Sequence, residues 1–75
     1  MRARAYTAVV RIQLNGQSRD LEQPTTVADL VRAIGLEESP CAVEVNARLV
    51  RRAERAATAL SDGDRVEVVT LVGGG

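Results

Sequence analysis

The chemically suggestive part of the sequence is its end, where the run VEVVTLV is followed directly by Gly73, Gly74 and Gly75. These residues have no side chains, so any chemistry they carry belongs to the backbone and to the terminal carboxylate of Gly75. Glycine lets an extended chain enter a channel too narrow for a Cβ atom. The run therefore favours a tail that a partner draws into its active site, whereas the alternative is a frayed end or a truncated linker.

The position of the three glycines favours the functional interpretation. No serine, proline or charged residue separates them from a strand-like segment, so the tail would start from a rigid sheet. A carboxylate reacts with nucleophiles only after activation, and the chain has no glycine-rich phosphate-binding motif for handling ATP. We therefore expect a partner enzyme to activate Gly75.

The composition excludes most other chemistry. The 75 residues suffice for one small domain, and ten basic residues balance ten acidic ones. Zero net charge argues against nucleic acid and against an anionic membrane as partners. Without lysine or histidine the chain lacks an amine nucleophile and an imidazole base, so we expect neither catalysis nor a metal site.

The single cysteine, Cys41, cannot form an internal disulfide. It has the same phase as Val43 and Val45, so we interpret it as a small buried residue rather than a reactive thiol. Arg11 interrupts the N-terminal apolar run before it reaches the length of a signal-peptide core. We expect a cytoplasmic protein that is a monomer when free.

The best-marked element is a helix in the segment PTTVADLVRAIGL, whose apolar residues recur at helical spacing. Thr26 is placed to cap its start, and Asp29 completes a capping box. Gly35 suits the left-handed position just past its end, with Leu36 folding back onto the helix.

Alternating hydrophobicity predicts strands on both sides of this helix. A first strand over 10–14 and a return strand over 17–22 flank Asn15-Gly16, which suits a tight hairpin turn. A third strand is expected over 41–46. A turn and a short fourth strand, a brief helical turn within 51–60, the turn SDGD and a last strand over 65–72 follow.

This order of elements predicts an α+β fold of the β-grasp type. We expect a mixed sheet of four to five strands with one main helix packed across one face, and with the last strand beside the first. Residues 1–7 are expected to be a loose N-terminal extension, 8–72 the β-grasp domain, and 73–75 a flexible glycine tail.

The last strand also offers a docking surface. Val66 and Val68 fit its buried face, which puts Glu67, Val69 and Leu71 on the opposite one. Two exposed aliphatic side chains beside the tail form, with Val72, a compact patch that we interpret as a partner contact; ordinary surface is the alternative.

A second surface feature is a cluster of arginines before the turn SDGD. We interpret it as a solvated face, with docking of an acidic partner as the alternative. Its members are Arg48, Arg51, Arg52 and Arg55.

Four segments together resemble the ThiS family of ubiquitin-like sulfur carriers in thiamine biosynthesis. They are LNG, TVADLVRAIGL, VEVNARLV and LSDGDRVEVVTLVGGG, and the resemblance covers roughly residues 9 to 75. DGDRVEVV joined to a terminal Gly-Gly is its most specific part. The chain departs from the family in Ala47, where glycine is frequent, and in its longer N-terminal segment.

The resemblance implies a non-enzymatic carrier that binds no cofactor itself. A ThiF-like adenylyltransferase would use ATP with magnesium to adenylate Gly75, and sulfur from a donor such as a cysteine desulfurase would displace AMP. The thiocarboxylate would then donate its sulfur to a ThiG-like thiazole synthase. Gly74 would be the obligatory slim neighbour of this covalent site, and Gly73 falls where the family is less strict.

Three other functions remain open. The small subunit of molybdopterin synthase shares the fold and the Gly-Gly end, but such subunits tend to have an aromatic, proline-rich approach to the tail, which VTLVGGG lacks. A ubiquitin-like protein modifier would attach Gly75 to lysines of target proteins. A plain β-grasp interaction module would make no use of the tail.

Overall fold

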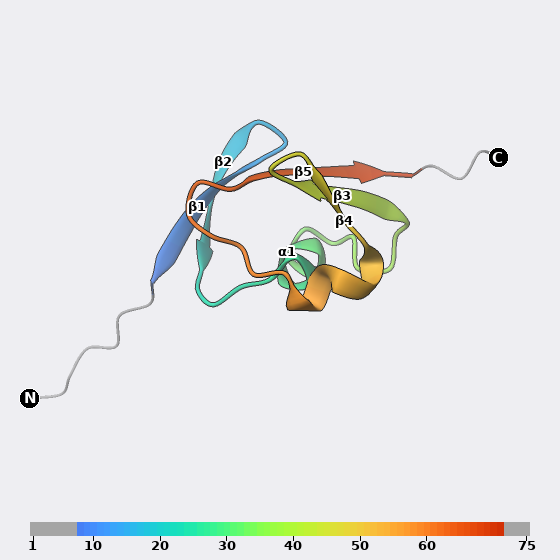
Figure 1. Cartoon of the computed structure of the whole chain (residues 1–75), viewed down its shortest axis with the longest axis horizontal. Helices are drawn as coiled ribbons and strands as arrows, with labels where there is room; N and C mark the ends of the chain where they lie inside the picture. The colour runs from blue at the N-terminus through green and yellow to red at the C-terminus, as the bar shows by residue number, and fades with distance from the viewer. Residues whose placement is uncertain (1–7, 72–75) are drawn as a thin grey trace, which may run out of the picture.

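The structure is a computed structural model that describes residues 8–71, which form a five-stranded mixed sheet and two short helices (Figure 1). The elements are β1 (Val9–Leu14), β2 (Gln17–Glu22), α1 (Val27–Ala33), β3 (Cys41–Val45), β4 (Arg48–Val50), the 3-10 helix η1 (Arg52–Ala57) and β5 (Arg65–Thr70). The extension expected over 1–7, the tail over 73–75 and Val72 lie outside the described residues. None of the helices within 8–71 is long and apolar enough to span a bilayer.

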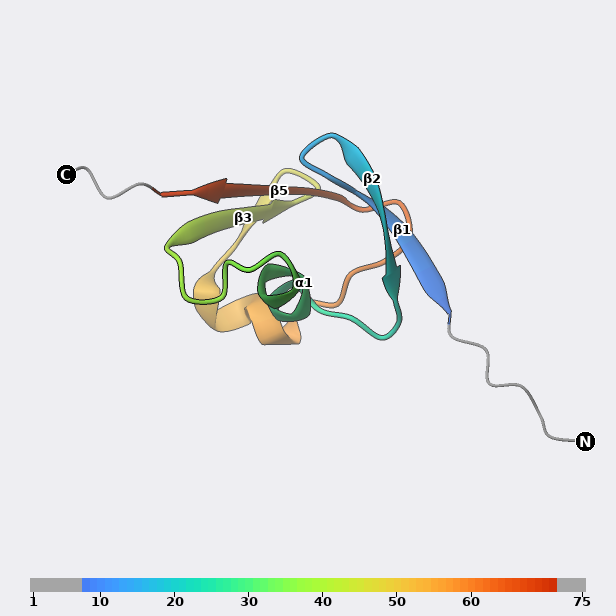
Figure 2. The ribbon, with the colours of Figure 1, turned by 180° about the vertical axis from the view of Figure 1, so that it is seen from behind.

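The sheet has the strand order β2-β1-β5-β3-β4. β5 pairs in parallel with β1, whereas the pairs β1–β2, β3–β4 and β3–β5 are antiparallel. The last strand therefore lies in the middle of the sheet, and α1 covers one face (Figures 1 and 2). This arrangement confirms the predicted mixed sheet with the last strand beside the first.

The hydrophobic core lies between the sheet and α1. Alternate residues of each strand point to one face, and in β1 and β5 these are the residues predicted from the sequence: Val10, Ile12, Val66 and Val68 are buried. Cys41 is a free cysteine that is 7% exposed, which confirms it as a small core residue.

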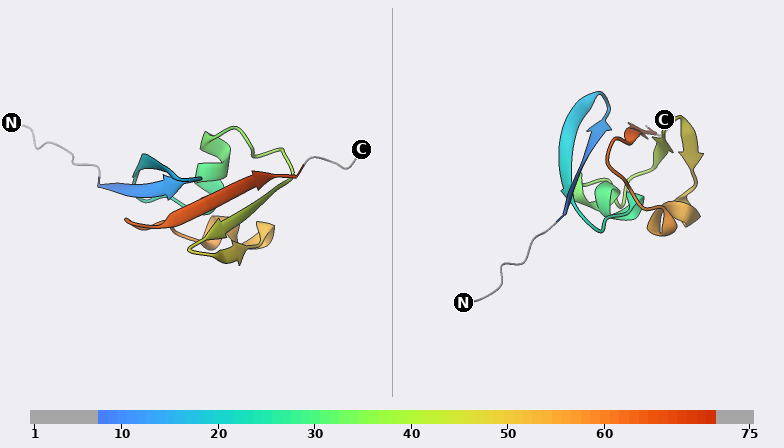
Figure 3. Two further views of the ribbon diagram at one scale, coloured as in Figure 1. Left: turned by 90° about the horizontal axis from the view of Figure 1, so that it is seen from above. Right: turned by 60° about the vertical axis from the view of Figure 1, so that its left-hand side comes forward.

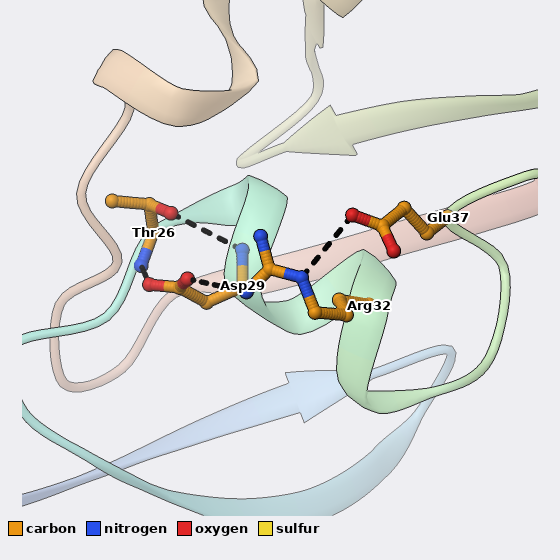
Figure 4. Close-up of polar contacts among 4 residues, drawn as sticks. All are labelled: Thr26, Asp29, Arg32 and Glu37. Carbon is orange, nitrogen blue, oxygen red and sulfur yellow. Dashed lines mark hydrogen bonds and ion pairs between the residues drawn. The ribbon is translucent and has the colours of Figure 1, made fainter.

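Helix α1 begins with the predicted capping box (Figure 4). The backbone N–H of Asp29 donates to the Thr26 hydroxyl oxygen at 3.2 Å, and the N–H of Thr26 donates to an Asp29 carboxylate oxygen at 3.0 Å. This last bond is the main reason that the pKa of Asp29 lies below its ordinary value. Asp29 also contacts Arg32, which in turn binds Glu37 at 3.2 Å (Figure 4). These ion pairs are exposed and add little to stability.

The end of α1 is a Schellman motif, in which a left-handed residue follows the helix. The N–H of Gly35 donates to the carbonyl of Arg32 at 3.0 Å, and the N–H of Leu36 donates to the carbonyl of Val31 at 2.9 Å. Gly35 has φ +81°, a backbone conformation that costs glycine little. Leu36 then packs against the core, as the sequence predicted.

The turn between β3 and β4 uses left-handed backbone without glycine. Asn46 has φ +52° and Ala47 has φ +69°. The side chain of Asn46 fixes the turn, because its Oδ1 accepts from the N–H of Arg65 at 2.9 Å and its Nδ2 donates to Asp64 at 2.9 Å. Ala47 lies in the left-handed region, where glycine would adopt the backbone conformation at lower cost.

The helical turn expected within 51–60 is η1, which packs beside α1. Two backbone hydrogen bonds join the segments that flank the two helices. The N–H of Val27 donates to the carbonyl of Thr58 at 2.9 Å, and the N–H of Leu60 donates to the carbonyl of Thr25 at 3.0 Å. This junction, with the isolated bridge between Thr26 and Ala59, ties the start of α1 to the segment that follows η1.

The prediction of a solvated arginine face is wrong for one member, Arg55, which is only 7% exposed. Its side chain runs inward from η1, and its Nη2 donates to the carbonyl of Cys41 at 2.6 Å. Its Nε is buried and has no hydrogen-bond partner among the described residues. Arg48, Arg51 and Arg52 are exposed, as expected.

Candidate functional site

The candidate site is the C-terminal end of β5, which lies at one end of the sheet (Figures 1 and 3). Strand β3 supports it along one edge, with Val69 opposite Ala42 and Thr70 opposite Cys41. One residue further, the N–H of Leu71 donates to the carbonyl of Pro40 at 2.9 Å. The chain is therefore held in the sheet up to Leu71, the last described residue before Val72 and the three glycines.

The other edge of β5 is supported by β1 and then by a single side chain. Pairing between the two strands ends at Leu14 and Val66, and the N–H of Asn15 donates to the carbonyl of Val66 at 2.9 Å. The Asn15 side-chain amide then takes the place of a strand residue. Its Oδ1 accepts from the N–H of Val68 at 2.8 Å, and its Nδ2 donates to the carbonyl of Val68 at 3.2 Å.

Sequence reasoning placed Asn15 in the hairpin turn and missed this second role. Its φ of +51° confirms the turn. Asparagine tolerates that backbone conformation, and its amide also presents a donor and an acceptor side by side. The second role depends on β5 lying next to β1, which is a feature of the tertiary fold and not of the segment LNG.

The predicted apolar patch faces solvent on the side of the sheet away from α1. Val69 is 57% exposed and Leu71 is 53% exposed, whereas Val66 and Val68 are buried. This confirms the predicted faces of the last strand. Val72, the third residue of the predicted patch, lies outside the described residues.

Next to this patch lie two carboxylates, and the sequence analysis placed only one of them, Glu67, on the outward face. Glu44 and Glu67 are directly opposite each other in the β3–β5 pair, and both are exposed. They share the outer face with Val69, which is two residues from Glu67 on the same strand. Neither takes part in the ion pairs found among residues 8–71. Like charges opposite each other destabilise a sheet, so the outer face combines aliphatic contact with unneutralised negative charge.

The described part of the site offers support and a contact surface. Within residues 8–71 no group of three or more His, Cys, Asp or Glu side chains is arranged to hold a metal ion. Cys41, which follows the Pro40 carbonyl that binds Leu71, is buried in the core.

A mixed sheet with parallel first and last strands, one helix across its face, and a last strand that leads to terminal glycines defines a β-grasp protein of the ubiquitin-like kind. The model of the ThiS family matches residues 12–75, a range that includes all three C-terminal glycines. This chain belongs to the ThiS family, as its sequence predicted.

Solved and curated proteins agree with this assignment. The crystal structure of the thiamine biosynthesis protein ThiS from Geobacter metallireducens superposes with a TM-score of 0.74 at 28% identity, over 88% of this chain and 100% of that one. An uncharacterized protein, ycf40 of Porphyra purpurea, is 30% identical over 66 residues, which are 88% of this chain and 93% of its own length. A thiazole synthase of Paramagnetospirillum magneticum is 33% identical over 66 residues, again 88% of this chain, but the chain spans only 20% of the length of that relative.

Proposed function

We propose that this chain is a sulfur carrier of thiamine biosynthesis and works through the carboxylate of Gly75. Its membership of the ThiS family and its similarity to a solved ThiS protein support the pathway. The observation that carries the proposal is the support of β5. β3 and Asn15 hold its two edges, and the strand leads through Leu71 and Val72 directly into the glycines.

The proposed cycle needs no catalytic group on this chain. An adenylyltransferase transfers AMP from ATP, used with magnesium, to the carboxylate of Gly75 and releases pyrophosphate. Sulfide displaces AMP and leaves a thiocarboxylate directly. If the donor is the persulfide of a cysteine desulfurase, its terminal sulfur displaces AMP to form an acyl disulfide, and a thiol reductant then cleaves the S–S bond to leave the thiocarboxylate. The carrier is thus a substrate of one enzyme and a sulfur donor to the next.

The residues before Gly75 present it to these enzymes. The proposed docking surface contains Val69 and Leu71, because exposed aliphatic side chains gain free energy when a partner removes them from water. Val72, the third member of the predicted patch, follows them in the sequence. Gly73 and Gly74 follow as backbone without Cβ atoms, which suits a narrow channel.

Thiazole synthase is the partner we propose for the second half of the cycle. In the curated thiazole synthases that match, a segment similar to this chain makes up 20% of a single polypeptide. This association supports contact between the carrier and the synthase. Because the first half of the cycle consumes ATP, we place the carrier in the cytoplasm.

The mass of the intact protein tests this proposal. The chain is incubated with ATP, a sulfur donor and the adenylyltransferase, and we expect one oxygen of the C-terminus to be exchanged for sulfur. A protein that lacks Gly75 is the control and should keep its mass. An unchanged mass of the full chain would contradict the proposal, and linkage of its C-terminus to lysines of other proteins would identify a protein modifier instead.

A further inference from the structure

The backbone of β5 alternates in the direction of its hydrogen-bonding groups. The N–H of Leu71 points to β3, where it binds the carbonyl of Pro40, and the carbonyl of Arg65 accepts from Asn46 on the same side. The carbonyl of Val66 and both backbone groups of Val68 point the other way, to Asn15. In an antiparallel pair this alternation continues along the strand.

The same alternation places the N–H and the C=O of Thr70 on the side away from β3. β1 cannot bind them, because its pairing with β5 is confined to the pairs Gln13–Arg65 and Leu14–Val66. The Asn15 amide uses its donor and its acceptor on Val68 and does not bind Thr70. Thr70 is exposed, and none of the hydrogen bonds across this edge within residues 8–71 uses its backbone. The open edge of β5 therefore begins at Thr70, directly before the tail.

We propose that an extended segment of thiazole synthase adds as a strand to the open edge of β5 at Thr70. The inference rests on the proposed function and adds to it the way in which the carrier is held. An antiparallel strand would exchange both backbone hydrogen bonds of Thr70 with one of its own residues. This contact uses the edge of β5, whereas Val69 and Leu71 use its outer face.

The geometry of the edge suits one short strand at a defined register. Proteins block open strand edges because such edges pair with other chains, and here Asn15 blocks β5 at Val68 and leaves Thr70 open. The backbone groups are available to an extended peptide and offer nothing to a helix, whose own groups are paired. A strand bound at Thr70 would fix the distance from the enzyme to the C-terminus.

Proline at position 70 tests the proposal, because it removes the N–H and places its ring on the open edge. Binding of the full-length chain to thiazole synthase is measured by titration calorimetry for the wild type, Thr70→Pro and Thr70→Ala. The alanine variant loses the side chain and keeps the N–H, so we expect its affinity to stay close to that of the wild type. We expect Thr70→Pro to bind at least about two- to tenfold more weakly, the value of one backbone hydrogen bond.

A second pair of variants shows whether proline has merely damaged the fold. The structure predicts that Thr70→Pro keeps the unfolding midpoint close to that of Thr70→Ala, since strand edges that face solvent tolerate proline. Val69→Pro removes an N–H on the β3 side and should lower the midpoint clearly. If Thr70→Pro unfolds as readily as Val69→Pro, the orientation of the edge is wrong and the proposal fails.

The remaining outcomes separate this inference from the proposed function. Equal binding of folded Thr70→Pro and wild type would overturn the strand contact, and thiocarboxylate formation by the wild type would leave the carrier function standing. A wild type that forms no thiocarboxylate contradicts the function itself. Self-association of the wild type that Thr70→Pro abolishes, with binding to the synthase unchanged, would assign the edge to a second copy and also overturn the proposal.

Discussion

Cys41 is the residue whose type most invites a sulfur-carrying role, and its surroundings argue against one. Its thiol is buried in the core, and its carbonyl accepts a hydrogen bond from Arg55. We predict that Cys41→Ser still forms the thiocarboxylate, since the sulfur is proposed to be carried on Gly75. The hydroxyl buried without a partner should lower the free energy of unfolding by about 1 to 3 kcal/mol. Intact mass and urea unfolding measure the two effects, and a folded variant without sulfur loading would place the chemistry on the thiol.

At Glu67 a substitution is predicted to stabilise the fold, whereas Cys41→Ser is predicted to destabilise it. Because Glu44 lies directly opposite, Glu67→Gln removes a like-charge contact and should raise the urea midpoint slightly. Glu44→Gln should raise it as much, and the double variant should gain little more, since one neutral partner already ends the repulsion. Glu38→Gln, an exposed control elsewhere, should leave the midpoint unchanged. Equal effects of all three single variants would show that net charge, and not the pair, is responsible.

At the scale of elements, the buried face of β5 stabilises the fold, whereas its exposed face is the proposed contact surface for partners. We predict that Leu71→Asp leaves the fold intact and weakens binding to the adenylyltransferase and to thiazole synthase, because an interface would have to desolvate the new charge. Val66→Asp puts the charge in the core and should unfold the domain. Circular dichroism and binding titrations distinguish the cases, and the reverse pattern would mean that the faces of β5 are exchanged.

The capping box of α1 gives an element-scale prediction about pH. The pKa of Asp29 is lowered in the folded protein, chiefly by the N–H of Thr26, so a proton binds this carboxylate more readily in the unfolded chain. The resulting stability is present above the ordinary pKa of 3.8 and is lost as the pH falls from there through the lower folded value. The stability of Asp29→Asn should therefore depend less on pH across this acid range than that of the wild type.

Thermal melts at several acidic pH values measure this dependence, with Glu38→Gln as the control for the loss of an exposed carboxylate. Asp20 also has a lowered pKa, because Arg11 donates to it, and it contributes to acid sensitivity in every variant. The informative quantity is thus the difference between Asp29→Asn and wild type. Identical pH profiles would show that the carboxylate of Asp29 adds nothing to the cap that an amide does not supply.

The elements with local signals were the ones that the sequence predicted well. Thr26 and Asp29 at one end of α1, and Gly35 at the other, act through bonds to residues within one turn of the helix, so the sequence pattern contains them. The hairpin at Asn15-Gly16 is local in the same sense.

The features that the sequence did not reveal all depend on strands far apart in the chain. Asn15 meets Val68 only because β1 and β5 are neighbours, and Glu44 meets Glu67 only in the observed register of β3 and β5. The burial of Arg55 likewise depends on where η1 crosses the start of β3. Of the candidate site, the outward face of Val69 and Leu71 could be predicted from alternation, whereas its supports and its open edge required the sheet order.

At the scale of the whole molecule, the sheet determines where the C-terminus can reach. The strand order puts β5 between β1 and β3, in the centre of the sheet (Figure 3). The hydrogen bond from Leu71 to Pro40 holds the chain in the sheet up to its last described residue. We propose that a partner docked on the sheet reaches the carboxylate only when the tail has the right number of residues. The length of the tail then matters as much as its composition.

Deleting Gly75 shows whether the partner needs the full length of the tail or only a Gly-Gly end, because Gly73-Gly74 remains as a Gly-Gly terminus. An enzyme that recognises only the motif would accept it, whereas an enzyme docked on the sheet would find the carboxylate short by about 3.3 to 3.6 Å, one extended residue. Misplacement by about 1 Å can lower a rate on the order of a hundredfold. We therefore predict that the deletion abolishes adenylation, measured by ATP–pyrophosphate exchange, without changing docking or the unfolding midpoint.

Two alanine variants control for the loss of glycine as such. Gly74→Ala should be severe, because its methyl group would enter the narrowest part of the channel, and Gly73→Ala should be far milder, since it lies further from the reacting carboxylate. Both keep the full length of the tail. A normal adenylation rate for Gly73→Ala, together with an inactive Gly75 deletion, would show that the deletion fails because the tail is too short. Near-normal adenylation of the deletion would instead show that the enzyme follows the tail wherever its last two glycines lie, and the rigid support of β5 by β3 and Asn15 would then serve stability alone.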